Sequence, residues 1–179
     1  DALSPLGVTD ISMPATPQSD WKLKLTLWDV ASESQLSRFT GHRDMVLHLR
    51  FSPDGERLYS ASGVTGMIRT RAGTGERRSP DISVRAWDVI SGEEIGQFGE
   101  YRMGISDLAI SQDGFLLAVA TGPAVRVFNT NTSERVTVFA DHAGTVTAVA
   151  FAAGGKFIVS ADETDRVYLW RVDELAGKE

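Results

Sequence analysis

Four arginines lie close together in one short stretch of this sequence. The stretch, residues 63–80, holds these four positive charges against a single acid, Glu76, in a chain whose net charge is −6. Guanidinium groups donate forked hydrogen bonds that match the geometry of carboxylates and phosphates. The stretch therefore predicts a site for an acidic peptide, a phosphate or a nucleic-acid backbone. Its binding residues would be Arg69, Arg71, Arg77 and Arg78, preceded by Met67 and Ile68.

The other titratable side chains do not suggest a catalytic or metal-binding set. The histidines are few and scattered, and no cysteine is present to form a disulfide or a thiolate metal site. The acids considered lie in turn sequences, where aspartate bonds to its own backbone, and no phosphate loop or nucleophile elbow is found. We therefore expect no catalytic residue, metal or cofactor. The histidines are His42, His48 and His142, and the acids in turn sequences are Asp54, Asp113, Asp162, Glu163 and Asp165.

A motif with fixed spacing recurs three times along the chain. Trp28-Asp29, Trp87-Asp88 and Phe128-Asn129 each precede a phenylalanine by eleven positions, and a ring side chain follows three positions later. A β-branched residue, another apolar residue and a glycine then come at constant intervals. Such self-similarity indicates one structural unit used repeatedly. The phenylalanines are Phe39, Phe98 and Phe139, the rings His42, Tyr101 and His142, and the glycines Gly55, Gly114 and Gly155.

Alternation of apolar and polar residues predicts that this unit is made of β-strands. Residues 83–87 and 166–170 alternate strictly, and no part of the chain sustains a helical period. Turn sequences, such as Ser-Pro-Asp-Gly at 52–55, separate the alternating runs. We therefore expect an all-β chain in which each unit is a small sheet of four antiparallel strands.

Together these features resemble the WD40-repeat family. The strongest copy combines Gly41-His42, the Phe-Ser-Pro-Asp-Gly run at 51–55, Ser-Ala-Ser at 60–62 and the run from Asp81 to Asp88. The resemblance covers residues 21–172 and implies a β-propeller, in which each repeat of ~40–45 residues supplies one blade. The expected architecture is a partial propeller of about three and a half blades.

The resemblance also implies a hydrogen-bond network inside each blade, which joins a histidine, a strand serine, an aspartate and a tryptophan. A buried indole N–H without a partner costs ~1–3 kcal/mol, so such a network stabilises the blade. The matching residues are His42, Ser60, Asp81 and Trp87 in the first complete copy, and His142, Ser160 and Trp170 in the last.

Two of the copies depart from this pattern. In the last copy the aspartate position falls on Thr164. The middle copy has Tyr101, Val119 and Phe128 at the histidine, serine and tryptophan positions. We expect it to be held by apolar packing alone and to be the most weakly specified blade.

The copies divide the chain into five parts. They are a leader or remnant strand (1–20), the last two strands of an incomplete blade (21–40), a blade with an inserted loop at 63–80 (41–98), a degenerate blade (99–139), and a final blade without its outer strand that ends in a charged tail (140–179).

Such an open arc would expose apolar blade faces to water, at ~1.5–3 kcal/mol for each large side chain. We therefore expect the chain to be the C-terminal part of a larger propeller, with its ring completed by missing blades. Self-association of two arcs is the first alternative, and a closed four-bladed ring is the second.

The inserted loop is the one clear departure from the repeat length. Leu58 and Trp87 are 29 positions apart, whereas the equivalent residues of the last copy, Ile158 and Trp170, are 12 apart. The resemblance places this loop on the face of the propeller that carries the Gly-His loops and most often binds partners. A solvated, irregular insertion without a partner is the alternative to the arginine site.

The expected function is that of a non-catalytic scaffold for protein–protein interaction, and we expect the protein to be soluble and cytoplasmic. Its loop face would dock a protein or a peptide, and the arginines favour an acidic partner. The net charge of −6 argues against nucleic acid or an anionic membrane as a partner of the whole chain. A propeller hydrolase with a site in the central channel is one alternative, but the innermost strands offer only His48, Arg50, Asp107 and Thr147. A purely structural spacer is the other.

Overall fold

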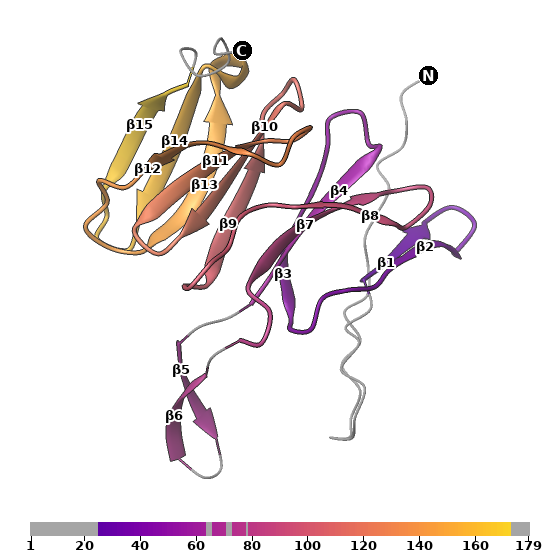
Figure 1. The fold of residues 1–179 in the computed structure, drawn as a ribbon, viewed down its shortest axis with the longest axis horizontal. Coiled ribbons are helices and arrows are strands. Elements are labelled where there is room, and N and C mark those ends of the chain that lie inside the picture. Colours follow the sequence, from indigo (N-terminus) through magenta and orange to yellow (C-terminus); the bar gives the residue numbers. More distant parts are fainter. Residues whose placement is uncertain (1–24, 64–65, 71–72, 78, 173–179) are drawn as a thin grey trace.

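The computed structural model describes residues 25–63, 66–70, 73–77 and 79–172, which form β-strands joined by turns (Figure 1). The expected all-β class is confirmed, and the strands are arranged as antiparallel sheets of two to four strands. The predicted leader, residues 1–20, lies outside the described residues.

Four small sheets follow one another along the chain, and a separate hairpin is inserted in the second. Sheet 1 pairs β1 (Leu25–Asp29) with β2 (Ser34–Phe39). Sheet 2 has the order β3 (Val46–Phe51), β4 (Arg57–Ser62), β7 (Ser83–Asp88) and β8 (Glu94–Gln97). Sheet 3 has the order β9 (Ile105–Ile110), β10 (Leu116–Thr121), β11 (Ala124–Asn129) and β12 (Arg135–Phe139). Sheet 4 consists of β13 (Val146–Ala152), β14 (Phe157–Asp162) and β15 (Val167–Arg171). The hairpin pairs β5 (Gly66–Thr70) with β6 (Gly73–Arg77).

Equivalent turns join the first two strands of sheets 2 and 3. Gly55 and Gly114 both have positive φ angles, +75° and +79°, in the left-handed region that glycine enters without strain. In each turn the glycine N–H donates to a serine carbonyl at 2.9 Å. The serine hydroxyl in turn donates to the turn aspartate, Asp54 or Asp113. The repeated Asp-Gly pair therefore fixes the turn, which accounts for these acids without a catalytic role.

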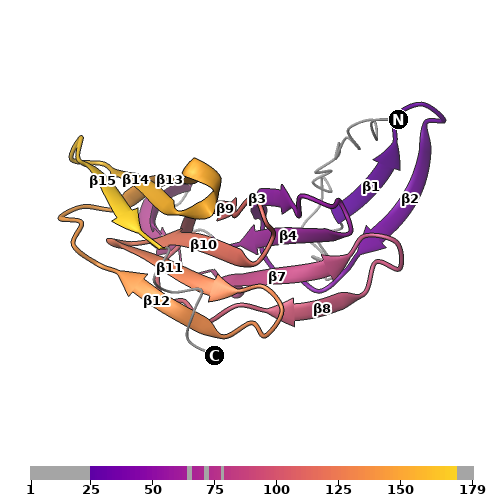
Figure 2. The ribbon, with the colours of Figure 1, turned by 90° about the horizontal axis from the view of Figure 1, so that it is seen from above.

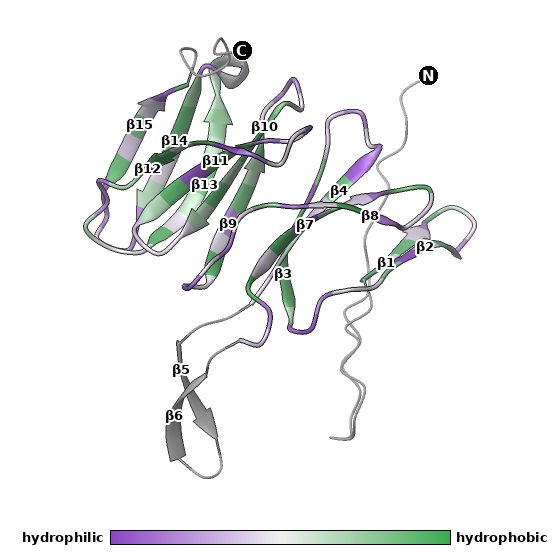
Figure 3. Ribbon diagram, in the orientation of Figure 1, coloured by the Kyte–Doolittle hydropathy of each residue, from purple (hydrophilic) through white to green (hydrophobic). Residues whose placement is uncertain are grey.

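The core lies between the sheets, because each sheet packs face to face on the next. Leu27 and Phe39 of sheet 1 cluster with Leu58 and Trp87 of sheet 2. The opposite face of sheet 2 packs on sheet 3, and the opposite face of sheet 3 packs on sheet 4. Figure 3 shows the apolar residues concentrated along the strands and the polar residues in the turns.

The sheets fan out around their first strands. Seen from above, β3 and β9 lie near the centre of the arc and β8 and β12 lie at its periphery (Figure 2). β9 contacts both β3 and β13. This arrangement is that of consecutive blades in a partial propeller, as expected.

Sheet 3 is filled by apolar side chains at positions where sheets 2 and 4 carry polar ones. Val119 is fully buried and Phe128 almost so, and both belong to the cluster between sheets 2 and 3. The Tyr101 hydroxyl is buried without a hydrogen-bond partner among the described residues. Burial raises the pKa of Tyr101, an effect that the nearby Arg126 guanidinium only partly opposes. The expectation that sheet 3 is the most weakly specified blade stays a prediction.

Replacing Tyr101 by phenylalanine is expected to stabilise the protein by ~1 kcal/mol, because a buried hydroxyl without a partner costs about that much or more. The matched control is Tyr168→Phe, which removes a hydroxyl that donates to the Asp141 carbonyl at 3.2 Å and is expected to be neutral or destabilising. Urea unfolding of both variants measures the difference. A loss of stability in Tyr101→Phe would show that the hydroxyl has a partner in solution.

Candidate interaction site

A chain of hydrogen bonds in sheet 2 connects the loop face to the blade interior. The Trp87 indole N–H donates to Ser60 Oγ at 2.8 Å, and Ser60 Oγ lies 2.7 Å from His42 Nε2. The other ring nitrogen of His42 lies 3.1 Å from Asp81 Oδ2. All four residues are buried. The structure therefore brings together the four residues that the resemblance to WD40 repeats implied in this copy.

Asp81 also fixes the point at which the inserted segment returns to the sheet. Its carboxylate accepts hydrogen bonds from the Arg43 N–H at 2.8 Å and from the Ser83 hydroxyl at 2.6 Å. Burial alone would raise the pKa of Asp81, but the bonds from His42, Ser83 and the Arg43 amide outweigh it and hold the pKa well below its usual range. The ionised carboxylate thus connects the Gly-His loop to the start of β7 through hydrogen bonds to both segments.

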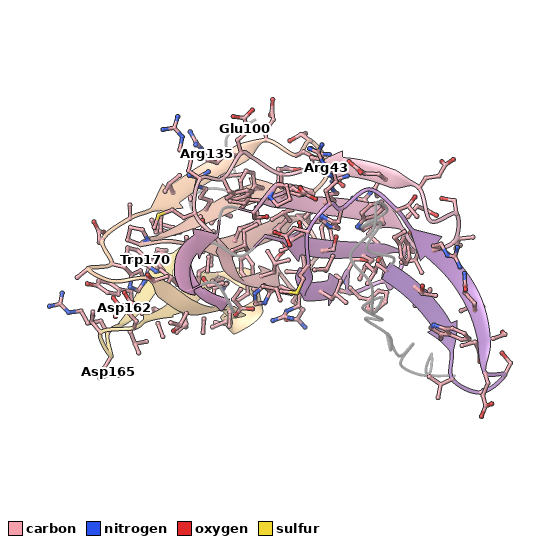
Figure 4. All side chains as sticks on the ribbon, turned by 90° about the horizontal axis from the view of Figure 1, so that it is seen from below. Arg43, Glu100, Arg135, Asp162, Asp165 and Trp170 are labelled. Atoms are coloured by element: carbon pink, nitrogen blue, oxygen red, sulfur yellow. The ribbon has the colours of Figure 1, made fainter. Side chains whose placement is uncertain are left out.

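Sheet 4 repeats this chain of hydrogen bonds, and Asp162 takes the aspartate role at a position other than the predicted one, which is occupied by Thr164. Asp162 Oδ2 lies 2.8 Å from His142 Nδ1, and Ser160 Oγ lies 2.7 Å from both the His142 and the Trp170 ring nitrogens. Thr164, predicted at the aspartate position, instead donates its hydroxyl to Asp162 at 2.6 Å. That assignment was wrong. In Figure 4, Asp162 and Trp170 are labelled within this sheet.

The local loop explains the shift. In sheet 2 the aspartate lies on the approach to β7, whereas in sheet 4 it is the last residue of β14. The connection between β14 and β15 is only a short turn, and Asp162 also accepts the backbone N–H groups of Thr164 and Arg166. The Thr164 hydroxyl lowers the pKa of Asp162 most, and together with the His142 bond it outweighs the opposing effect of burial.

The arginine-bearing segment forms a hairpin over its paired residues, and its role as a partner site or as a solvated insertion stays a prediction. β5 and β6 pair from Gly66 with Arg77 to Thr70 with Gly73. Figure 1 shows the hairpin standing away from the four sheets. Of the predicted partner-binding residues, Met67, Ile68 and Arg69 are in β5 and Arg77 is in β6, while Arg71 and Arg78 lie outside the described residues.

The hairpin leaves sheet 2 on the face of the Gly-His loops. β4 and β7 remain paired up to Ser62 and Ser83, so the insertion does not interrupt the sheet. The Gly63 N–H donates to the Met45 carbonyl at 3.2 Å, which joins the start of the insertion to the loop that follows His42. This shared face, made of the Gly-His loops and the base of the hairpin, is called the loop face below.

The innermost strands bring together residues that the sequence left apart. Arg50 Nη2 donates to Asp107 Oδ1 at 2.8 Å, and His48 Nδ1 lies 3.9 Å from the same oxygen. The Val149 N–H donates to Asp107 Oδ2 at 3.0 Å, so one carboxylate contacts sheets 2 and 4 from sheet 3. Burial lowers the pKa of His48, which the Asp107 carboxylate only partly opposes.

This cluster has the character of a brace between sheets. The fourth inner residue, Thr147, donates its hydroxyl to the Ala161 carbonyl of its own sheet at 3.3 Å. Within the described ranges no group of three or more His, Asp or Glu side chains is arranged to hold a metal ion. The arrangement can link neighbouring inner strands by charge and hydrogen bonds.

The repeat-by-repeat geometry agrees with a match to a known family. A model described as "WD domain, G-beta repeat", of the WD40 family, matches residues 33–69 and 133–171. These two segments contain the histidine and serine of both hydrogen-bond chains described above. The chain contains WD40 repeats. The matched segments include β3 and β4 of sheet 2 and all three strands of sheet 4.

Several curated proteins are similar to this WD40 chain. Target of rapamycin complex subunit wat1 of Schizosaccharomyces pombe is 33% identical over 92 residues, which cover 50% of this chain and 29% of wat1. Protein groucho of Drosophila melanogaster is 28% identical over 148 residues, covering 82% of this chain and 18% of groucho. Pre-mRNA-processing factor 19 of Oryza sativa is 33% identical over 181 residues, covering 83% and 34%. The chain thus spans about a third or less of each of these relatives.

No helix in the described part of the chain is long and apolar enough to cross a membrane.

Removing the Ser60 hydroxyl tests how much the hydrogen-bond network of sheet 2 contributes to the free energy of unfolding. Ser60→Ala leaves the Trp87 indole and one His42 nitrogen without their partner, so we expect a loss of about 1–3 kcal/mol in the free energy of unfolding. Ser91→Ala, which removes an exposed hydroxyl bonded to Asp88, is the control and should change stability by less than ~0.5 kcal/mol. Equal effects in the two variants would contradict a buried network.

The two clamped aspartates predict how stability changes with pH. Because their folded-state pKa values lie below the ordinary value of ~3.9, the stability they contribute is present above that value and is lost as pH falls below it. We expect wild-type stability to fall between about pH 5 and pH 3, and to fall less steeply in the double variant Asp81→Asn, Asp162→Asn. Urea unfolding across this range measures both slopes, and identical slopes would contradict the assignment.

Proposed function

We propose that this WD40 chain is a non-catalytic docking platform whose partners bind the loop face. The observation that carries the proposal is the β5–β6 hairpin, which extends from that face while its two ends are held by the sheet 2 pairing and by Asp81. Insertions in repeat proteins commonly lie on a binding face. One relative, wat1, is by name a subunit of a complex, which supports a role in assembly.

Charge favours an acidic partner. The hairpin segment carries four of the 18 basic residues of a chain with net charge −6. Arg43 and Arg102, each directly following the ring residue of its Gly-His-type loop, are exposed on the same face. Arginine pairs with carboxylates through two parallel hydrogen bonds, which adds geometric selectivity to attraction. The proposed partner is therefore a protein or peptide that presents acidic side chains.

The proposal includes completion of the ring by another blade. Val84 and Ala86 of sheet 2 are buried beneath sheet 3. Their equivalents in sheet 4, Val167 and Leu169, are 69% and 64% exposed. We propose that a further blade of the same kind covers that face. Sedimentation of the chain over a range of concentrations tests whether a second copy supplies it.

Neither alternative function gains support from a specific contact. The Asp107 cluster could suggest a hydrolase in the channel, but its carboxylate is occupied by Arg50 and by the Val149 N–H. A spacer without partners would leave the exposed arginines of the loop face without a role.

Exchanging Arg69, Arg71, Arg77 and Arg78 for serine is expected to reduce the capture of partner proteins by the immobilised chain at least about fivefold, because their charge and forked donors are lost. The control exchanges Arg38 and Arg135, which are exposed on the outer strands β2 and β12. Quantitative mass spectrometry of the captured proteins measures both. Unchanged capture by the hairpin variant would reject the arginine site.

A further inference from the structure

A small pocket opens on the loop face between the first strands of three consecutive sheets. It has a volume of about 280 Å³ and is lined by Leu47 of β3, by Met103, Ile105 and Ser106 around the start of β9, by Gly122 in the β10–β11 turn, and by Thr145 before β13. Gly63, at the base of the β5–β6 hairpin, completes the wall. The pocket therefore lies beside the hairpin and is built by residues from sheets 2, 3 and 4.

Two polar groups of the pocket are already bonded within the protein. The Ser106 hydroxyl donates to the carbonyls of Ala120 and Val146. The Thr145 N–H donates to Glu163 Oε1 at 3.0 Å. A polar ligand would have to displace these bonds, so the pocket favours an apolar group.

Two half-exposed apolar side chains flank the opening. Leu47 is 48% exposed and Met103 is 50% exposed, while Ile105 is buried. The other large apolar side chains that are exposed in the described residues lie elsewhere: in turns at the opposite ends of the strands, on outer strands, or on β15. Leu47 and Met103 are thus the apolar contacts that this face offers a partner.

Met103 is held close to a glycine that has a strained conformation for any other residue. Gly122 has a φ of +50°, and a Cβ atom there would lie 2.4 Å from Met103 Sδ. The glycine therefore gives the thioether room beside the backbone. Methionine adapts its shape to different apolar partners, because its side chain is unbranched and polarizable.

The size of the pocket limits its occupant. Sites for small molecules usually have volumes of ~300–1,000 Å³ and enclose most of the ligand. A pocket of about 280 Å³ at the surface lies below this range, which favours a part of a larger partner, such as a side chain, over a whole small molecule.

The charges around the pocket limit what flanks that side chain. Arg102 directly precedes Met103 and is exposed, and Arg43 is exposed in the adjacent loop, where Figure 4 shows it from the loop-face side. The hairpin that starts at the pocket wall adds four arginines in sequence. Among the acids of this face, Glu163 is engaged with the Thr145 N–H, while Glu100 and Asp141 are exposed in the loops that precede Tyr101 and His142.

From this combination we propose that the pocket binds one apolar side chain of a partner peptide whose neighbouring residues are acidic. The apolar side chain packs between Leu47 and Met103, and the flanking carboxylates pair with the exposed arginines. This inference rests on the proposed docking function and names the position and chemistry of its contact.

The test uses a fluorescein-labelled synthetic peptide with one leucine between two pairs of glutamates, and measures its Kd for the full chain by fluorescence anisotropy. The double variant Leu47→Gln, Met103→Gln is expected to weaken binding about tenfold or more. The matched control is Ile90→Gln, Phe115→Gln, which changes two exposed apolar residues in turns at the opposite ends of the strands and should change Kd less than about twofold.

Two altered peptides separate the apolar contact from the charges. Replacing the leucine by serine should weaken binding to the wild type about tenfold and abolish the difference between wild type and pocket variant. Replacing the glutamates by glutamines should weaken binding and flatten its dependence on salt. Circular dichroism of each variant checks that the fold is retained.

The proposal is overturned if the leucine peptide does not bind the wild type at low salt, or if it binds the pocket variant equally well. Loss of self-association in the pocket variant would identify a second copy as the occupant and would also overturn it. If the pocket variant is unaffected while exchange of the hairpin arginines abolishes partner capture, the docking function stands and the pocket assignment fails. If both sets of variants are unaffected, both fail.

Discussion

Every sheet of this protein depends on its neighbour to keep apolar side chains out of water. A sheet of two to four short strands has two faces and cannot bury either one alone. Val84 in sheet 2 and Leu117 in sheet 3 are fully buried because they lie in one cluster, and Val127 and Val149 are paired in the same way between sheets 3 and 4. The stability of one blade is therefore set mainly by the blades beside it, as in other linear repeats.

Within this frame, individual blades are held by two kinds of interior. Sheets 2 and 4 contain a serine hydroxyl that bonds both a histidine and a tryptophan, and an aspartate then ties the histidine to a loop. Sheet 3 has Val119 in the serine position and is filled by apolar contacts. The polar chains have a directional geometry that apolar packing lacks, and they extend from the interior to the loop face. Rigidity of the sheet is thereby transmitted to the segments that a partner would meet.

The sequence was most informative where one repeat could be compared with another. Constant spacing marked Trp87 and His42 as repeat positions, and the resemblance to WD40 repeats then implied that they form a network with Ser60. It misassigned the aspartate of the last copy, since Asp162 reaches the histidine from the end of a strand and only the length of the turn decides this. Spacing within a repeat also carries no signal for contacts between repeats.

Those contacts explain what could not be predicted. Arg50 and Asp107 belong to different sheets and meet because their strands lie side by side at the hub. The pocket flanked by Leu47 and Met103 likewise draws its walls from three repeats. The paired strands of the insertion were missed for a different reason: glycines and arginines dominate that segment, and their alternation is too weak to indicate a hairpin.

The uninterrupted pairing of β4 with β7 has a consequence for how this protein could diversify. The ladder extends to Ser62 and Ser83 with the whole insertion between them, and lengthening a loop adds only slowly to the entropy cost of its closure. The length and composition of the segment between those residues can therefore change during evolution and acquire new ligands. Such changes would leave the stability of the sheets nearly unaltered.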